Sequence, residues 1–520
     1  MTVADAKARP LPAGDEALVL NESRLPLLLG LYAAAWLLLL AWCARTPPFD
    51  DIEQLVWVHS LEWGYFKHPP LPTWILAGAS LIAPQGPPLT YVLGAFSILG
   101  AHAIFWYVLR AVHGRRIATV LLLASLCITL YNQRLHYFNH NVVMMPAIAV
   151  CVAMTWRLTL RHSWGAWAAI GVAMGLGMLT KYQVALAGIC IGLWWLRMRW
   201  WREPAHVKGL LLAVLIACMI FLPHVLWLIH HDWAPLHYAE KTSLGIGLSP
   251  AERVRASVEW LADWLLNRSM PAWMVVGATL AWASRRAKAS GAEPVLPEPA
   301  PEVPAVWREF WLLWGFVPML LMMGLGLGLG MGVELQKHWG TAFMLWTLPA
   351  MLALKPKTFT FLGTSAAQRA AWVAFCVIQG LTLVQFWATS PKGLSSLNTG
   401  HWQYFPSQEL ADQLAPKARA ALGGPIDIIS GRSAIAGALS LRMPEHPKVL
   451  INGDPSTSPW ISAEELKNAR IIEVFPAEEL PPGAQWAWPG WAWRLGWSPL
   501  SRLQPQDVRS PQSEPAHGDH

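Results

Sequence analysis

Residues 50–72 read DDIEQLVWVHSLEWGYFKHPPLP, and this stretch concentrates ionisable side chains in a chain that is otherwise strongly hydrophobic. Pro69 and Pro70 fix the backbone φ angle, remove two N–H donors and force His68 out of the helical region. The KHPP segment is therefore predicted to be a rigid extended elbow that positions its side chains. The preceding residues, EQLVWVHSLEWGYF, have apolar side chains at helical spacing, which predicts a helix lying in the plane of a membrane interface.

The composition around this stretch is that of a polytopic membrane protein. Of the 520 residues, 54% are hydrophobic and 14% are charged, against a usual charged fraction of about 25%. The six cysteines lie in or beside apolar runs, at spacings that match neither a zinc site nor a redox pair. The net charge of +7 comes from basic residues dispersed between apolar runs. This dispersal is not typical of nucleic-acid binding, which needs a basic stripe on one face.

Apolar runs of about 20 residues are long enough to span a membrane as helices. Eleven such spans are predicted, at residues 25–43, 88–109, 117–133, 141–160, 164–180, 182–198, 208–229, 270–284, 309–332, 338–354 and 370–389.

The orientation follows from the lysine and arginine content of the loops, which is higher on the cytoplasmic side. With residues 1–24 as a cytoplasmic tail, the inside loops are rich in basic residues. The short outside loops hold one cation each, namely Lys67, Arg134, Lys181 and Lys337. An odd number of spans then places the C-terminus outside.

The remaining chain divides into a linker, a domain and a tail. Residues 289–306, ASGAEPVLPEPAPEVPAV, predict a flexible cytoplasmic linker inside the transmembrane domain 25–390. Beyond the last span, PSQELADQLAPKARAAL and RSAIAGALSLR predict helices, and PIDIIS, KVLING and RIIEVF predict strands. We therefore predict a small α/β domain outside the membrane at 391–485, followed by a disordered tail at 486–520. The predicted fold class is an α-helical polytopic membrane protein with about eleven transmembrane helices and this C-terminal domain.

Most of the chemically suggestive side chains fall in the outside loops. Charges at span ends also serve as interfacial anchors. Single cations from several loops beside carboxylates, however, suit a site that holds an anionic phosphate while a carboxylate handles a proton. These outside residues are Asp50, Asp51, Glu53, Lys67, His68, Arg134, His136, His140, Asn141, Lys181, Tyr182, His230, His231, Asp232, Lys337 and His338.

Three segments resemble one known family. The stretch DDIEQLVWVHSLEWGYFKHPPLPTWI is similar to the DE-x-Y-Y... G-Y-x-x-H/K-P-P-L first outer loop of the family 39 glycosyltransferases. These are GT-C type integral-membrane enzymes and the bacterial relatives of dolichyl-phosphate-mannose protein mannosyltransferases and of the lipid A aminoarabinose transferase. GLGMLTKYQVAL resembles the family's GLG-x-LTK segment, and FLPHVLWLIHHDWAPLHYA resembles its P-x-x-x-W-N... HDWASF segment.

The resemblance implies roles for individual residues. Asp50 stands at the catalytic aspartate, which acts as a base on the acceptor or orients it, and Asp51 stands at the following acidic position. Tyr65, His68 and Lys181 match residues that contact the phosphate of the lipid-linked donor. The full set predicted to bind that phosphate is Tyr65, Lys67, His68, Arg134, Lys181, Lys337 and His338. Further candidates around the site are Glu53, His140, Asn141, Tyr182, His231 and Asp232.

The sequence also departs from the family. An acidic residue often begins the fourth span, where FNHNVVMMP offers only Asn139, His140 and Asn141. If that carboxylate is required, activity is in question or the role moves to Asp51 or Glu53.

Two further patterns have simpler explanations. GLGLGLGMG at 324–332 lacks the preceding strand of a dinucleotide-binding motif, and close helix packing explains it better. HHD at 230–232 has no second pair at ligand spacing, so no metal site is assigned and a divalent cation remains an alternative.

The resemblance implies a hexosyl- or pentosyltransferase of the bacterial inner membrane. Such an enzyme takes a sugar from a polyprenyl-phosphate donor and transfers it to a lipid, glycan or protein acceptor at the periplasmic face. The product would belong to the cell envelope, for example to lipopolysaccharide. A transporter or flippase for a lipid-linked sugar is the alternative from another class, although no inverted repeat is visible. An inactive binding protein for such a lipid is the third interpretation. Neither the oligomeric state nor a certain cofactor follows from the sequence.

Overall fold

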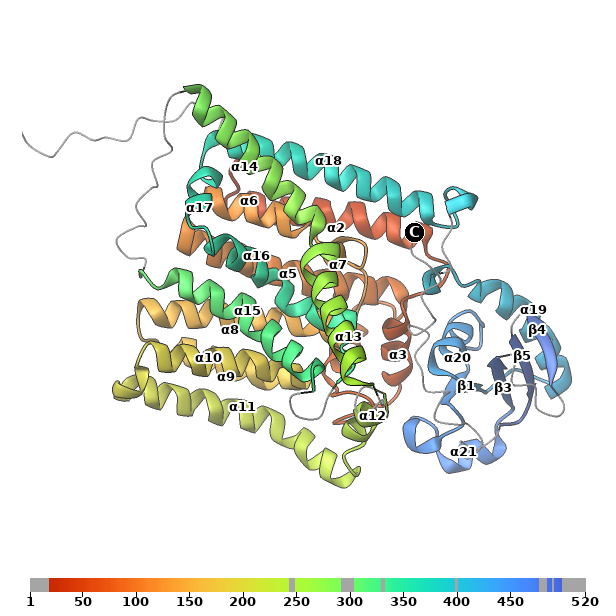
Figure 1. The fold of residues 1–520 in the computed structure, drawn as a ribbon. Coiled ribbons are helices and arrows are strands. Elements are labelled where there is room, and N and C mark those ends of the chain that lie inside the picture. Colours follow the sequence, from red (N-terminus) through yellow and green to blue (C-terminus); the bar gives the residue numbers. More distant parts are fainter. Residues whose placement is uncertain are drawn as a thin grey trace, which may run out of the picture.

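The protein consists of a bundle of long helices with a small α/β domain at one end (Figure 1). The computed structural model describes residues 18–242, 248–290, 304–328, 333–397, 401–476, 484–488 and 491–497. Most of the predicted linker and the tail beyond Trp497 lie outside the described residues. We call the end of the bundle next to the α/β domain the domain end, and the opposite end the far end.

Each of the eleven predicted spans overlaps a helix in the described part of the chain. These helices are α2 (Arg24–Cys43), α5 (Pro87–His113), α6 (Arg115–Ser125), α8 (His140–Leu160), α9 (Trp164–Met178), α10 (Ala185–Arg197), α11 (Pro204–His230), α14 (Met270–Ser290), α15 (Trp307–Gly326), α16 (Thr341–Ala353) and α18 (Ser365–Thr389). Among the described residues, six of them, α2, α5, α8, α11, α15 and α18, are long enough and apolar enough to cross a membrane. The predicted fold class is confirmed.

Local sequence signals explain several helix boundaries. Prolines occupy the first turns of α5 and α11, where a missing N–H is tolerated. Gly114, at φ 83°, connects α5 to α6 in a left-handed conformation that favours glycine. The connecting segments form shorter elements: α3 (Phe49–Trp57), α4 (Leu71–Ala79), α7 (Thr129–Asn132), η1 (Tyr182–Val184), η2 (Trp200–Arg202), α12 (Ala234–Thr242), α13 (Pro250–Ala262), the π-helical η3 (Asp263–Arg268), η4 (Lys337–Gly340) and α17 (Lys357–Leu362).

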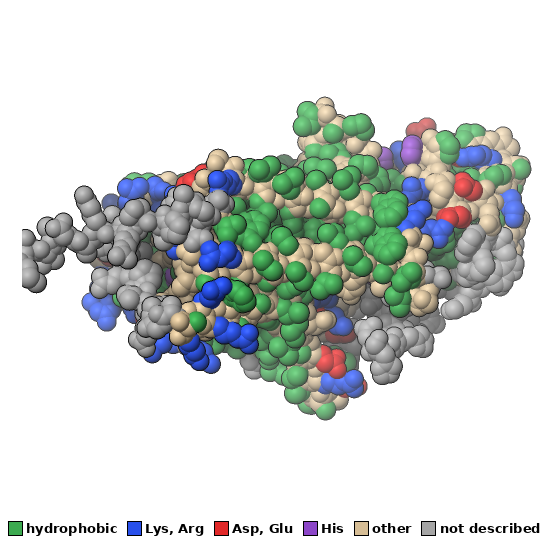
Figure 2. Space-filling model, turned by 90° about the horizontal axis from the view of Figure 1, so that it is seen from above, with side chains coloured by type: hydrophobic (Ala, Val, Ile, Leu, Met, Phe, Trp, Pro, Cys, Tyr) green, Lys and Arg blue, Asp and Glu red, His purple; other side chains and the backbone are tan. Residues whose placement is uncertain are grey.

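Contacts between loops agree with the predicted alternation of sides. At the far end, Arg197 Nε of α10 lies 2.5 Å from Glu309 Oε2 of α15. Arg116 of α6 donates to the carbonyl of Gly363. These residues all lie in loops or at span ends that are predicted to share one side. Figure 2 shows hydrophobic side chains across the helical surface, with lysine and arginine side chains at both ends of this hydrophobic band.

The α/β domain follows α18. Its elements are η5 (Ser395–Leu397), η6 (Trp402–Tyr404), α19 (Ser407–Leu422), β1 (Ile428–Gly431), α20 (Ser433–Ser440), β2 (Lys448–Ile451), η7 (Pro455–Thr457), α21 (Ala463–Asn468), β3 (Ile471–Pro476), β4 (Gln485–Trp488) and β5 (Trp491–Leu495). The strand order is β2-β1-β3-β5-β4. Strand β1 is parallel to β2 and β3, and β5 is antiparallel to β3 and β4. The predicted α19, β1, α20, β2 and β3 are confirmed.

The boundary of the tail differs from the prediction. Strands β4 and β5 occupy residues for which the sequence predicts disorder, because β5 pairs with β3 from Ile472↔Leu495 to Pro476↔Trp491. A strand pair that gains its hydrogen bonds from a neighbouring sheet is not visible in local composition.

The helix of the first loop also differs from the prediction. It ends at Trp57 and does not lie on a lipid interface, because protein covers it on two sides. Ile52 and Val56 pack in the core of the α/β domain. Leu55 packs with Phe138 at the domain end of the bundle. The apolar side chains at helical spacing therefore face protein, and α3 joins the two parts of the molecule.

Candidate active site

Asp50 and Asp51 lie in the first turn of α3, where a helix N-terminus favours negative charge. The side-chain amide of Asn139 donates to Asp50 Oδ2 at 2.9 Å. The backbone N–H of Phe138 donates to Asp51 Oδ1 at 2.9 Å. Asn139 is fixed in turn, because its Oδ1 accepts from the N–H of Val142 at 3.0 Å and caps α8. The segment before α8 thus holds both carboxylates in place.

The two carboxylates differ in their surroundings. Asp51 is fully buried, and burial raises its pKa well above the usual range, which favours its neutral form. Asp50 is half-buried, and its negative charge acts on both Lys67 and Lys181. Asp50 is therefore the accessible carboxylate, and Asp51 supports the segment before α8.

Lys67 forms a buried ion pair with Glu53 of α3. Its Nζ lies 3.0 Å from Oε1 and 2.9 Å from Oε2 of Glu53. The side chains are 14% and 4% exposed. The rings of Phe49 and Tyr238 lie 5.6 and 5.7 Å from Nζ. Burial opposes the charge of Lys67, but the Glu53 carboxylate raises the pKa of Lys67 above its usual value.

His68 lies beside His140 at the start of α8, with ring centroids 4.1 Å apart. His140 Nε2 lies 3.2 Å from the carbonyl oxygen of Pro69. Burial lowers the pKa of His68 well below its usual value, and the neighbouring His140, Lys67 and Lys181 lower it further. His68 is therefore neutral and can offer a hydrogen bond, but it supplies no permanent charge.

Lys181 follows α9 and reaches the same region. Its Nζ donates to Asn141 Oδ1 at 2.7 Å and lies 5.2 Å from the centre of the Trp339 ring. Burial lowers the pKa of Lys181 to about 7, although Asp50 counteracts part of this effect. The direct partners of Lys181 are thus neutral groups, in contrast to the Glu53 carboxylate that pairs with Lys67.

Two arginines lie near His338, which is also near Lys181. Arg134 lies 5.4 Å from the centre of the Tyr137 ring. Arg268, at the end of η3, forms an ion pair with Asp263. Burial lowers the pKa of Arg268, and the positive charge of Arg134 lowers it further. His338 of η4 is within electrostatic reach of Lys181, Arg134 and Arg268. The domain end therefore gathers cations from several loops, with Lys67 and Lys181 near Asp50, and the two arginines near His338.

Other candidate residues are used elsewhere. The Tyr65 hydroxyl donates to the carbonyl of Ser60 at 2.7 Å, and its ring stacks on Trp57 at 4.7 Å. The Tyr182 hydroxyl lies 2.8 Å from His224 Nε2. Tyr65 links two parts of the first loop, and Tyr182 links η1 to α11.

Three predicted site residues are exposed. His231 lies at the end of α11 and stacks on Trp227, with ring centroids 4.1 Å apart. The side chain of Asp232 is 98% exposed. Lys337 is exposed at the start of η4. The structure does not bring these residues into the cluster around Asp50.

Sequence reasoning missed several members of the cluster. In the sequence Asn139 is a departure from the family, whereas in the structure it is the direct partner of Asp50. Tyr238 and Arg268 had no motif to mark them. Arg268 was visible only as one of several cations in a long loop, and Tyr238 only within the HDWAPLHYA segment. Their contacts depend on tertiary structure.

The described residues hold no group of three or more histidine, cysteine, aspartate or glutamate side chains that could bind a metal ion.

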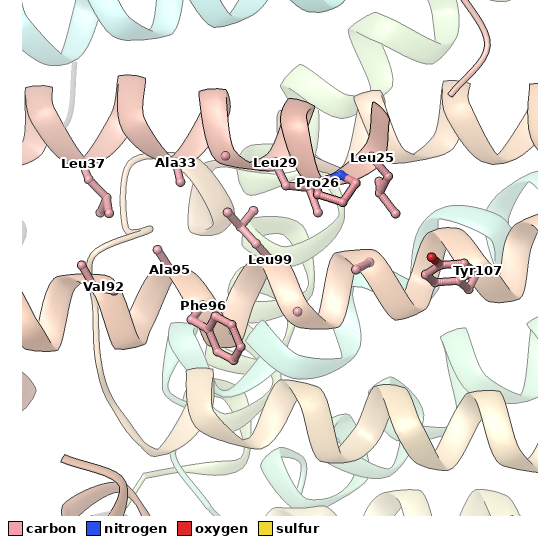
Figure 3. A pocket seen from close by; sticks show the side chains of 13 residues that line it. Leu25, Pro26, Leu29, Ala33, Leu37, Val92, Ala95, Phe96, Leu99 and Tyr107 are labelled. Carbon is pink, nitrogen blue, oxygen red and sulfur yellow. The ribbon is translucent and has the colours of Figure 1, made fainter. Parts of the chain in front are cut away.

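A separate apolar groove of about 440 Å³ lies between α2 and α5 (Figure 3). Leu29 and Ala33 of α2 and Ala95 and Leu99 of α5 are among its lining residues. None of the charged residues around Asp50 lines the groove. Both helices are apolar enough to cross a membrane, so the groove offers van der Waals contacts at membrane depth.

Comparisons with known proteins find similarities in sequence and in fold. Residues 67–227 match the family model described as dolichyl-phosphate-mannose-protein mannosyltransferase. The lipid A galacturonosyltransferase RgtD of Rhizobium johnstonii is 24% identical over 216 residues, which cover 38% of this chain and 43% of the relative. The lipopolysaccharide core galacturonosyltransferase RgtA of the same organism is 24% identical over 220 residues, which cover 41% and 43%. The chain thus matches less than half the length of these curated relatives.

A solved structure extends the likeness to nearly the whole chain. The crystal structure of ArnT from Cupriavidus metallidurans bound to undecaprenyl phosphate matches with a TM-score of 0.57 and 16% identity, and the match covers 93% of this chain and 100% of that one. The resemblance drawn from the sequence motifs is therefore confirmed: this chain has the fold of the GT-C type integral-membrane glycosyltransferases, and its residues 67–227 match the model of the dolichyl-phosphate-mannose-protein mannosyltransferase family.

Proposed function

We propose that this protein transfers a glycosyl group from a polyprenyl-phosphate-linked sugar to a lipid acceptor. The observation that carries the proposal is the position of Asp50, an accessible carboxylate within electrostatic reach of two half-buried lysines, Lys67 and Lys181. A carboxylate can take up a proton, and a lysine with neutral partners can bind a phosphate. Both groups lie at the end of an apolar bundle, where the phosphate of a membrane lipid can reach them.

The orientation belongs to the proposal. Loops rich in lysine and arginine face the cytoplasm in bacterial membrane proteins, so the far end is the cytoplasmic end. The domain end, with Asp50 and the α/β domain, is then on the periplasmic side of the inner membrane. The sugar carrier crosses the membrane before the reaction, so the site needs no nucleotide sugar.

Lys181 is the main phosphate contact in this proposal. The charge of Lys67 is balanced by Glu53 at 2.9 Å, whereas Lys181 contacts the neutral amide of Asn141. A carboxylate at position 141 would neutralise Lys181, and the asparagine leaves its charge for the phosphate. The neutral His68 can donate a hydrogen bond to the same group. The arginine Arg134 adds positive potential.

The reaction follows from these positions. Asp50 accepts the proton of the acceptor hydroxyl, or orients that hydroxyl, as its oxygen attacks the anomeric carbon. The bond between the anomeric carbon and the phosphate oxygen breaks, and the polyprenyl phosphate leaves with an additional negative charge. Lys181 stabilises that charge in a site of low dielectric, where electrostatic contacts are strong. Asn139 keeps Asp50 in position through its amide.

The names of the relatives narrow the substrates. RgtD and RgtA are named for galacturonosyl transfer to lipid A and to the lipopolysaccharide core. We therefore favour a hexosyl donor over a pentosyl donor, and a lipopolysaccharide-type acceptor over a protein. The apolar groove between α2 and α5 is consistent with a lipid substrate.

The test is transfer in detergent. Purified protein is incubated with a polyprenyl-phosphate donor that carries a radiolabelled sugar and with a lipid A or lipopolysaccharide core acceptor. The expected result is label on the acceptor, without a sealed membrane or a gradient. Asp412→Asn, on the exposed side of α19, is the matched control for Asp50→Asn, which is expected to abolish the labelling. Donor binding without labelling of the acceptor would instead identify an inactive binding protein. Movement of the donor across the membrane of reconstituted vesicles, again without labelling, would identify a flippase.

A further inference from the structure

Helix α20 of the α/β domain packs against α3, the helix that carries Asp50. Ile435, Ala436 and Leu439 of α20 share a buried cluster with Ile52 and Val56 of α3. Helix α3 carries Asp50 in its first turn and Glu53 one turn later, and residues three apart lie on the same helix face. A shift of α3 would therefore move both acidic side chains.

The approach of the two helices is unusually close at Gly437. A Cβ atom at this position would lie 2.3 Å from Cγ2 of Ile52 and 3.2 Å from Cγ2 of Val56. Contacts below 3 Å do not occur between real side-chain carbons without displacement. Glycine is therefore needed at 437 for α20 to lie against α3 at this distance.

One polar contact reinforces the packing. The hydroxyl of Ser433, the first residue of α20, lies 3.3 Å from Glu53 Oε1. Ser433 is 8% exposed and Glu53 is 3% exposed. A buried carboxylate needs its lone pairs satisfied, and the same Oε1 also accepts from Lys67 at 3.0 Å. Ser433 thus fixes the carboxylate that holds the Lys67 ammonium.

We propose that the α/β domain is a positioning element of the active site, in which Ser433 acts through Glu53 to place the Lys67 ammonium. Gly437 sets the distance of α3, and with it the place of Asp50. The inference rests on the proposed function where it is tested by transfer kinetics. Where it is tested by chemical labelling of Lys67, it rests on the contacts alone. Ser433 is buried and acts through Glu53, so it is a positioning residue.

The kinetic test uses two serines of the same helix. Ser433→Ala removes the contact to Glu53, and Ser440→Ala is the matched control, since the Ser440 hydroxyl donates to the carbonyl of Pro447 at 2.6 Å. We expect Ser433→Ala to raise the KM for the lipid-linked donor about tenfold, the size of a lost hydrogen bond to a charged group, with kcat little changed. Ser433→Thr keeps the hydroxyl and should restore the KM. Equal KM changes in Ser433→Ala and Ser440→Ala would overturn the proposal.

The chemical test does not depend on the proposed function. Lys67 is 14% exposed, so an amine-reactive reagent should label it slowly in the folded protein, as read by mass spectrometry. We expect faster labelling of Lys67 in Ser433→Ala than in Ser440→Ala at equal thermal stability. An unchanged labelling rate would overturn the positioning role. Faster labelling in a protein that transfers no sugar would retain that role and reject only the proposed function.

Discussion

The first loop and the end of α11 both place histidines and acidic residues beside a predicted span, yet these side chains differ in burial and in their partners. In the first loop, Asp51 and Glu53 are 0% and 3% exposed. The backbone N–H of Phe138 donates to Asp51, and Lys67 of the same loop pairs with Glu53. At the end of α11, Asp232 is 98% exposed and His231 stacks on Trp227 of its own helix. Ionisable groups acquire unusual chemistry where distant segments desolvate and pair them.

The largest expected effect of this difference is on stability. Glu53→Ala leaves Lys67 buried without its carboxylate, so the free energy of unfolding should fall by about 3–5 kcal/mol. Glu240→Ala breaks an exposed pair with His237 at 3.6 Å, and its effect should stay below about 1 kcal/mol. Thermal unfolding in detergent compares the two variants. Adding Lys67→Met to Glu53→Ala should recover part of the loss, and equal losses in the two single variants would remove the buried pair from the account.

The second effect is on donor binding. Lys181→Met should lower kcat/KM for the lipid-linked donor about 30- to 1000-fold, which corresponds to about 2–4 kcal/mol of lost charge stabilisation. Lys337 was predicted for the same role but is exposed, and Lys337→Met should lower kcat/KM by less than about threefold. Equal losses of kcat/KM in the two variants would contradict the assignment of the half-buried Lys181 as the main phosphate contact.

The third effect is a pH dependence that comes from Lys181. Its pKa is about 7 in the protein without donor, and a bound phosphate raises that pKa because it stabilises the charged form. Donor affinity should therefore be highest below pH 7. Above pH 7 the apparent Kd should rise about tenfold per pH unit until the pKa of the bound state is reached. A phosphodiester donor stays a monoanion throughout, so it does not contribute.

Lys181→Arg provides the control for this dependence. A guanidinium keeps its charge across the range, so the variant should bind the donor with an affinity that does not change between pH 6 and 9. Titrations by isothermal calorimetry supply both curves. A flat curve for the unmodified protein would show that Lys181 is not the titrating contact.

The smallest effect concerns the end of α11. His231→Ala and Asp232→Asn should change transfer by less than about twofold, as expected of exposed positions. The same transfer assay measures both. A loss comparable to that of Lys181→Met would mean that this segment closes over the site when substrate binds.

Local pattern was sufficient for much of the fold. The apolar runs place the eleven helices, and the alternation of helix and strand signals after α18 places α19, β1, α20, β2 and β3. The local sequence pattern was insufficient for the surroundings of α3, because a helix at a lipid interface and a helix covered by protein have the same apolar face in sequence. The residues that cover α3 lie some 380 positions later, as the Ser433–Glu53 contact shows.

The candidate site was predicted only in part, again because side chains from distant segments meet there. The motif resemblance identified Asp50, His68 and Lys181, which the structure brings together. It also drew attention to Asn139 and Asn141 as missing carboxylates. The structure shows what these amides contact: Asn139 donates to Asp50, and Asn141 accepts from Lys181. An amide can donate or accept a hydrogen bond without adding charge. Which of the two it does depends on its partner, and the sequence does not identify that partner.

The most direct measurement is a pair of readings on Asp50→Asn, taken with the lipid-linked donor. The account predicts that this variant binds the donor with near-normal affinity, because Lys181, Lys67 and His68 are intact, while transfer falls about 100- to 10,000-fold, the range of a lost general base. Unchanged transfer with an unchanged fold would contradict the account, because another group would then have to act on the acceptor.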